Sequence, residues 1–271
     1  MTNPVDATVK NRLNTRAQRL CVWAGPVMIF TWLLAFVFLC RFVPPPSPAM
    51  SAQQLVAKFG EDTNAIRLGL VISLFSCSLL VPFSSVIATQ MRRIEGPRSV
   101  LANASLVSGG LLCVEFLLPF AIWQTALYRL DEWDPKLVQM LNDMSWLMFL
   151  GIISSACVQV ACLGVCVLRD HREETIFPRW YGYLNIWISI MWFPAGWIPF
   201  FKIGAFAWNG LMAWYLPLTI YLCWFIVTIV LLLRAISHEE REVTALDLGH
   251  TGETLQHDEP EDAVLTPLAQ S

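Results

Sequence analysis

Glu115 is the residue whose chemistry is most unusual for its place in the sequence, because it is a carboxylic acid within an apolar segment. The segment from Leu101 to Arg129 can cross a bilayer as a helix, since a helix rises about 1.5 Å per residue and the hydrocarbon layer is about 30 Å thick. A carboxyl group at that depth is costly unless it is protonated, paired or hydrated, so such residues are functional-site candidates. We therefore treat Glu115 as a candidate ligand-binding residue. The alternative is a protonated carboxyl that hydrogen-bonds between helices and only fixes their register.

The rise per residue places side chains of other apolar segments at the depth of Glu115. Pro194 lies at that depth, and it would leave the carbonyl of Ile190 without its amide partner. Several tryptophans lie nearby in the sequence, and their N–H groups need partners, which suggests a protein-lined cavity; the alternative, which the sequence favours slightly, is plain packing. Ser76, Ser155 and Tyr221 lie at matching positions of other spans, and Gln159 lies on the same helical face as Ser155. The predicted binding residues are Glu115, Ser76, Ser155, Gln159, Trp192, Pro194 and Tyr221.

The sequence contains none of the short motifs that mark common catalytic or cofactor sites. Gly-x-Ser-x-Gly, His-Glu-x-x-His and Gly-x-Gly-x-x-Gly are all absent. None of the four histidines lies within a predicted span, and His171, beside Asp170 and Arg172, has the surroundings of a solvated loop residue. We therefore predict no catalytic residue, no metal site and no cofactor.

Eight cysteines invite a metal or disulfide interpretation, but their positions argue against both. Seven lie inside apolar segments, and Cys40 lies at the end of the first one. The spacing of Cys157, Cys162 and Cys166 matches no zinc motif. We interpret the cysteines as small, weakly polar packing residues.

The composition is that of an all-α membrane protein with several passes. Hydrophobic residues make up 56% of the chain and charged residues 14%, against a usual charged share of about 25% in soluble domains. The apolar runs predict a bundle of six transmembrane helices, close to residues 20–40, 66–89, 100–127, 146–168, 180–201 and 211–233.

Small and weakly polar residues recur at helical spacing in three of these spans. Such stripes let helix backbones approach closely in lipid, so we expect them to face the interior of the bundle. The stripes are Gly69, Ser73, Cys77 and Ser84 in the second span; Ala104, Ser108 and Glu115, continuing to Pro119, in the third; and Gly151, Ser155, Gln159, Cys162 and Cys166 in the fourth.

The distribution of Lys and Arg predicts that both termini are cytoplasmic. With that orientation, twelve Lys or Arg residues flank the spans on the inside and six on the outside. Outside, Ser51 begins a short helix in Ser-x-x-Gln capping-box form, with Leu55, Val56 and Phe59 on one face and Gly60 at its end. We expect this helix to lie on the membrane surface, and we expect the protein in a plasma membrane, as a bacterial inner-membrane protein.

The chain divides into three regions by charge and hydropathy. A basic cytoplasmic N-terminus covers residues 1–19, and the transmembrane domain covers 20–235. Residues 236–271 carry nine Asp or Glu residues against the single basic Arg241. Because this tail lacks apolar periodicity, we predict that it is disordered.

Two functions fit these observations. The first is binding or transport of a small apolar or amphipathic molecule in an intramembrane cavity near Glu115. The second is a non-catalytic membrane subunit or scaffold, whose acidic tail or acidic outer loop contacts a basic protein partner. In both cases the surroundings are membrane lipid, and we expect no nucleic acid to bind.

Overall fold

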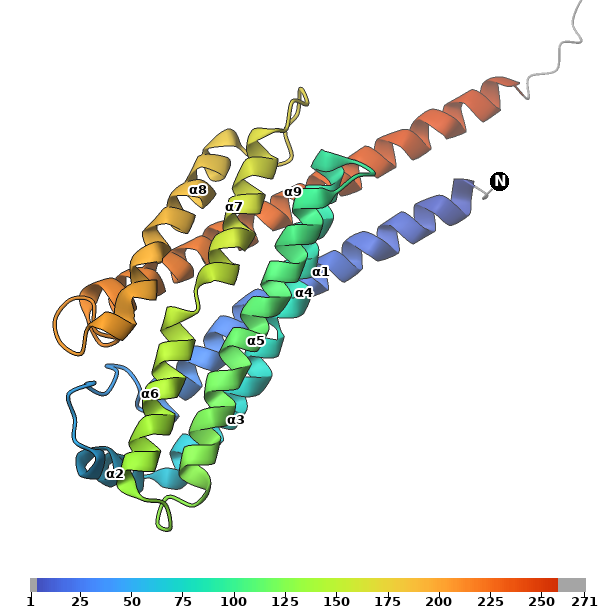
Figure 1. The fold of residues 1–271 in the computed structure, drawn as a ribbon. Helices are drawn as coiled ribbons and strands as arrows, with labels where there is room; N and C mark the ends of the chain where they lie inside the picture. Colours follow the sequence, from blue (N-terminus) through green and yellow to red (C-terminus); the bar gives the residue numbers. More distant parts are fainter. Residues whose placement is uncertain (1–3, 258–271) are drawn as a thin grey trace, which may run out of the picture.

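The computed structural model describes residues 4–257, and every regular element in that part of the chain is helical (Figure 1). Two π-helical segments and one 3-10 segment accompany the α-helices: η1 (Ala35–Leu39), η2 (Phe193–Phe200, 3-10) and η3 (Leu211–Tyr215). The α-helices are α1 (Pro4–Leu34), α2 (Ala52–Gly60), α3 (Thr63–Ser78), α4 (Leu80–Glu95), α5 (Val100–Tyr128), α6 (Pro135–Gly151), α7 (Ser154–Leu168), α8 (Arg179–Trp192) and α9 (Leu216–His257).

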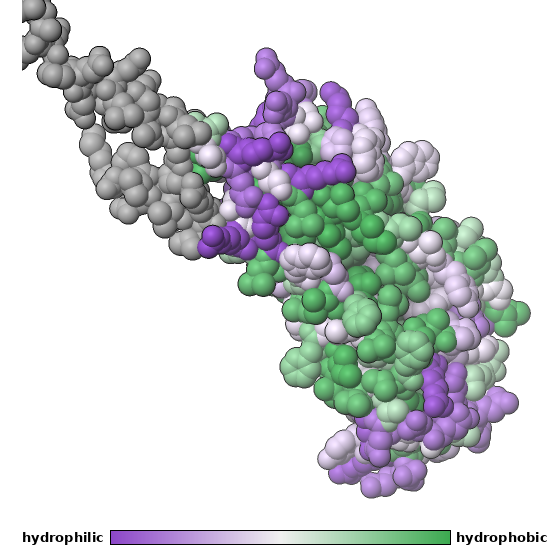
Figure 2. Space-filling view, turned by 180° about the vertical axis from the view of Figure 1, so that it is seen from behind, coloured by the Kyte–Doolittle hydropathy of each residue, from purple (hydrophilic) through white to green (hydrophobic). Residues whose placement is uncertain are grey.

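Five helical stretches of the described chain are long and apolar enough to cross a membrane. They are Asn14–Leu39, Thr63–Glu95, Val100–Tyr128, Pro135–Leu168 and Leu211–Ala245. Figure 2 shows hydrophobic side chains over the middle of the molecule and hydrophilic side chains gathered at its two ends. Length, composition and this surface pattern together are those of a membrane protein.

The predicted span at 180–201 is not among these five stretches. There α8 has 14 residues and gives way to the 3-10 segment η2 at Phe193. Pro194 follows directly, and its ring removes an amide hydrogen and cannot continue an α-helix without strain.

Two of the long stretches are broken near the middle. Between α3 and α4 the break lies at Leu79, and Pro82 in the first turn of α4 explains it, because proline has no N–H to donate to the carbonyl of Ser78. Between α6 and α7 the break lies at Ile152 and Ile153, with no proline near it. Each break interrupts the helical hydrogen bonds of the backbone within a long apolar stretch.

α5 packs against α3, α4, α6 and α7, while α1 packs against α3, α4 and α9. Glycines allow the closest approaches: a Cβ on Gly109 would lie only 2.6 Å from Nε2 of Gln159 on α7. Many residues of the predicted small-residue stripes are indeed buried: Gly69, Ser73, Cys77, Ser84, Ser108, Ser155, Gln159 and Cys166.

The chain connections are divided between two ends of the bundle. The start of α1, the end of α9, and the α4–α5 and α7–α8 connections lie together at one end (Figure 1). The opposite end carries α2, and Gln139 of α6 donates to the carbonyl of Met50 there at 2.9 Å. The predicted capping box of α2 is present, with Ser51 and Gln54 each bonded to the other's backbone amide.

The first part of the acidic tail is helical, whereas the sequence predicts disorder for the whole tail. Residues 236–257 continue α9 as helix, whereas residues 258–271 lie outside the described part of the chain. Glu240 pairs with Arg19 at 2.6 Å, and Glu242 pairs with Arg93 at 2.6 Å. These partners neutralise the first acidic residues, so the helix does not end where the apolar sequence ends. Of the basic N-terminus, residues 4–19 belong to α1.

Candidate functional site

A cavity of about 80 Å³ lies inside the bundle, and segments from nearly every part of the chain contribute to its wall. Met28 and Trp32 come from α1, Leu112 and Phe116 from α5, and Tyr221 from α9. Every lining residue is apolar or aromatic, with no charged group among the described ones. Its wall is that of a site for an uncharged, largely apolar molecule.

Several of the helix interruptions border this cavity, although the break at Leu79 does not. Ile152 and Ile153, which separate α6 from α7, both line it. Ala195 of η2, Ala213 of η3 and Pro217 at the start of α9 line it as well. Irregular backbone inside an apolar layer is tolerated where protein buries it or where it borders a cavity. These irregular segments therefore form part of the cavity wall.

Aromatic rings form much of the wall. The rings of Trp192 and Tyr221 have centroids 6.2 Å apart, and those of Phe116 and Tyr221 lie 6.3 Å apart at a steep angle. Phe149 lies 6.4 Å from Trp214. These rings continue into a larger aromatic cluster, centred on Phe36, Phe42, Trp123 and Trp146, that fills the α2 end of the bundle.

Two of the seven predicted binding residues, Trp192 and Tyr221, line the cavity. Glu115 does not, although Leu112 and Phe116 on the same helix do. Instead Glu115 is half-buried and accepts a hydrogen bond from the hydroxyl of Ser155 at 2.5 Å. This contact joins α5 to α7, which is the arrangement expected if Glu115 sets the helix register.

The remaining predicted residues lie in other contacts. Gln159 donates from Nε2 to the hydroxyl of Ser84 at 3.0 Å, joining α7 to α4. Ser76 shares a hydrogen bond of 2.7 Å with Thr31, joining α3 to α1. Pro194 lies in η2, one residue before the lining Ala195. The polar residues predicted to form one binding site thus form separate hydrogen bonds between different pairs of helices.

The sequence reasoning missed Trp32, Trp214 and Pro217 as lining residues. Pro217 carried a detectable signal, because a proline inside an apolar span marks a broken helix in the same way as Pro194. Trp32 and Trp214 lie in segments whose patterns gave no reason to bring them together. Only the packing of α1 against α9, and of α9 against η3, places them at one cavity.

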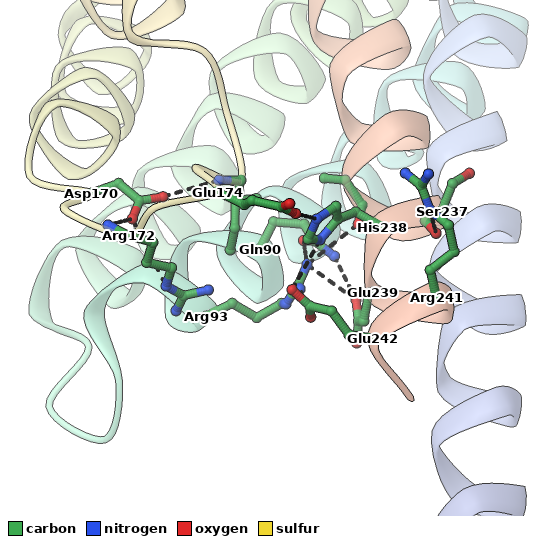
Figure 3. A network of polar contacts seen from close by, with 12 residues as sticks. Gln90, Arg93, Asp170, Arg172, Glu174, Ser237, His238, Glu239, Arg241 and Glu242 are labelled. Atoms are coloured by element: carbon green, nitrogen blue, oxygen red, sulfur yellow. Dashed lines mark hydrogen bonds and ion pairs between the residues drawn. The ribbon is translucent and has the colours of Figure 1, made fainter. Parts of the chain in front are cut away.

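A polar cluster joins α4, α9 and the α7–α8 connection (Figure 3). Arg93 of α4 bonds Gln90 at 2.7 Å and Glu242 of α9 at 2.6 Å. Gln90 in turn donates to Glu239 at 2.9 Å, and His238 lies 2.7 Å from Glu174 of the α7–α8 connection. The cluster fastens α4, α9 and that connection to one another.

Within residues 4–257, no group of three or more His, Cys, Asp or Glu side chains is placed to hold a metal ion. Comparison of the chain with protein families, curated proteins and solved structures finds no match. The chemistry of the site must therefore be argued from its own residues.

Proposed function

We propose that the chain is an integral membrane protein that binds, and in its membrane moves, a small apolar or amphipathic molecule held in the cavity between Trp192, Trp214 and Tyr221. The observation that carries the proposal is the meeting of helix breaks and aromatic rings at one apolar cavity. Ligand sites between helices have walls of this kind, with few polar groups. Broken helices at a central site are also typical of secondary transporters.

The proposal includes the topology expected from the sequence. The chain crosses the membrane six times, and α8 with η2 forms the fifth crossing. Both termini lie on the cytoplasmic side, and the membrane is a plasma membrane, expected to be the inner membrane of a bacterium. In its support, the start of α1, the end of α9, and the α4–α5 and α7–α8 connections share one end of the bundle (Figure 1). Most of the Lys and Arg residues belong to the segments next to that end.

The alternative of a scaffold with an acidic tail has weaker support. Three carboxylates at the start of that tail, on Glu239, Glu240 and Glu242, contact Arg19, Arg93 and neighbouring glutamines of the same chain. They are thus already paired within the chain.

Native mass spectrometry of the protein purified from its host in mild detergent tests the proposal. Ala156 lines the cavity, and an Ala156→Leu substitution would fill part of it. Val158 lies on the same helix with 48% of its surface exposed, so Val158→Leu adds bulk away from the cavity and serves as the matched control.

We expect a small molecule to remain bound to the wild type and to Val158→Leu, and to be lost from Ala156→Leu. If all three proteins are free of small molecules, or if Ala156→Leu retains the molecule as well as the control does, the proposed function is wrong.

A further inference from the structure

The aromatic residues around the cavity carry hydrogen-bonding atoms that are buried without partners. Among the described residues, Nε1 of Trp32, Trp192 and Trp214 and the hydroxyl of Tyr221 are buried and have no hydrogen-bond partner. All four residues line the cavity. Trp192 and Trp214 are only 2% and 1% exposed, so lipid headgroups and bulk water do not reach them. Buried polar atoms are normally paired, and each exception needs an explanation.

Buried indoles elsewhere in this bundle do find partners. Trp123 donates to the side-chain carbonyl of Asn142 at 3.2 Å, and Trp224 donates to that of Asn185 at 2.9 Å. Trp208 donates to the backbone carbonyl of Pro46 at 2.7 Å. Trp133 and Trp146 are also unpaired, and they lie in or beside the aromatic cluster rather than at the cavity. The fold therefore supplies acceptors to three buried indoles elsewhere but to none of the three indoles that line this cavity.

The unpaired groups at the cavity are mainly donors. An indole nitrogen can only donate, and a phenol can donate or accept. These four are the only side-chain nitrogen and oxygen atoms among the residues that line the cavity, and none of the others is charged. A ligand carboxylate or ammonium group would have no counter-charge there. A ligand with only donors would leave the three indoles as they are.

We infer that the ligand is a neutral molecule with an apolar body and carbonyl oxygen acceptors, of the ketone, ester or quinone class. Its oxygens accept from the indole N–H groups and the Tyr221 hydroxyl, while the hydrocarbon part contacts Leu112, Phe116 and the isoleucines of the α6–α7 break. This inference rests on the proposed function, because it specifies the ligand of the same cavity.

Equilibrium dialysis with two probes of matched shape tests the inference. Acetophenone and isopropylbenzene differ in that a carbonyl oxygen in the first replaces a methyl group in the second. Both are measured against the full-length protein in dodecyl maltoside micelles, with binding to protein-free micelles subtracted. The variants are Tyr221→Phe and Trp192→Phe, and Trp187→Phe on α8, which is 61% exposed, is the control.

We expect saturable binding of acetophenone to the wild type and to Trp187→Phe. In Tyr221→Phe or Trp192→Phe this binding should be weakened about fivefold, which is the effect of losing one neutral hydrogen bond. Binding of isopropylbenzene should be weaker and should not respond to these variants.

The two claims fail in different ways. If isopropylbenzene binds as tightly as acetophenone, and the phenylalanine variants leave both unchanged, the acceptor inference is wrong while the cavity still binds. If neither probe binds saturably and native mass spectrometry also finds the cavity empty, the proposed function itself fails. A variant that does not fold is replaced by Trp214→Phe, which removes a different unpaired donor.

Discussion

Gly109→Ala is the substitution whose effect on the bundle follows most directly from the structure. A Cβ at this position would lie 2.6 Å from Nε2 of Gln159 and 2.7 Å from Cβ of Ser84, so α4, α5 and α7 cannot all keep their places. Crowding of this kind costs about 1–3 kcal/mol. The 3.0 Å bond between Gln159 and Ser84 would also be disturbed, and interhelical bonds in membranes average about 0.6 kcal/mol.

The neighbouring Gly110 provides a matched control, because a Cβ there would meet no atom within 4 Å. Replacing glycine by alanine in a helix is favourable by up to about 1 kcal/mol, and this gain applies to both variants. We therefore expect Gly109→Ala to lower the free energy of unfolding by about 1–3 kcal/mol and Gly110→Ala to leave it unchanged or slightly raise it. Reversible unfolding in mixed micelles measures both. Equal stability of the two variants would refute the close packing of α5 against α4 and α7.

Three further predictions concern the polar contacts. Arg93→Gln should lower the free energy of unfolding by about 1–3 kcal/mol, because the carboxylates of α9 lose the cation that pairs with them. The control in the same unfolding experiment is Arg92→Gln, which loses only a hydrogen bond to Asn103. Equal effects of the two substitutions would contradict the pairing of Arg93 with α9. Glu115→Gln should leave unfolding within about 0.5 kcal/mol of wild type, since the amide oxygen still accepts from Ser155. It should also leave acetophenone binding unchanged in dialysis, and a loss comparable to that in Trp192→Phe would return Glu115 to the binding site.

The helical class and most of the apolar stretches could be predicted from the sequence, because hydropathy over a long window depends on the segment alone. The capping box at Ser51 could be predicted for the same reason, since its two bonds are local. The predicted spans at 66–89 and 146–168 each fall within one of the long apolar stretches, and each contains a break in the helix. Pro82 is a sequence signal for the break between α3 and α4, whereas no residue type signals the break between α6 and α7 at Ile152.

The candidate site could be predicted only in part. Depth along the helix selected Tyr221, which does line the cavity, but it also selected Ser76 and Ser155, which bond to other helices. Depth does not fix the direction in which a side chain points, because that depends on the rotation of each helix against its neighbours. The rotation of α5 turns Leu112 and Phe116 to the cavity and leaves Glu115 bonded to α7.

The α9 helix shows a similar limit. The charge of residues 236–271 alone predicts disorder, but the ion pairs of Glu240 and Glu242 involve Arg19 and Arg93, which lie far away in the sequence. Local composition does not reveal such partners. Among the described residues of the α5–α6 connection, by contrast, the acidic side chains form only the local ion pair of Glu132 with Arg129.

The central claim is that the cavity admits a small apolar molecule, and a crystal structure of the protein soaked with bromobenzene tests it most directly. The bromine atom gives an anomalous signal that locates the probe without assumptions about its orientation. We predict an anomalous peak enclosed by Trp192, Trp214 and Tyr221, and its absence from crystals of Ala156→Leu. Bromine peaks confined to the lipid-facing surface, with the cavity unoccupied in the wild type, would contradict the claim.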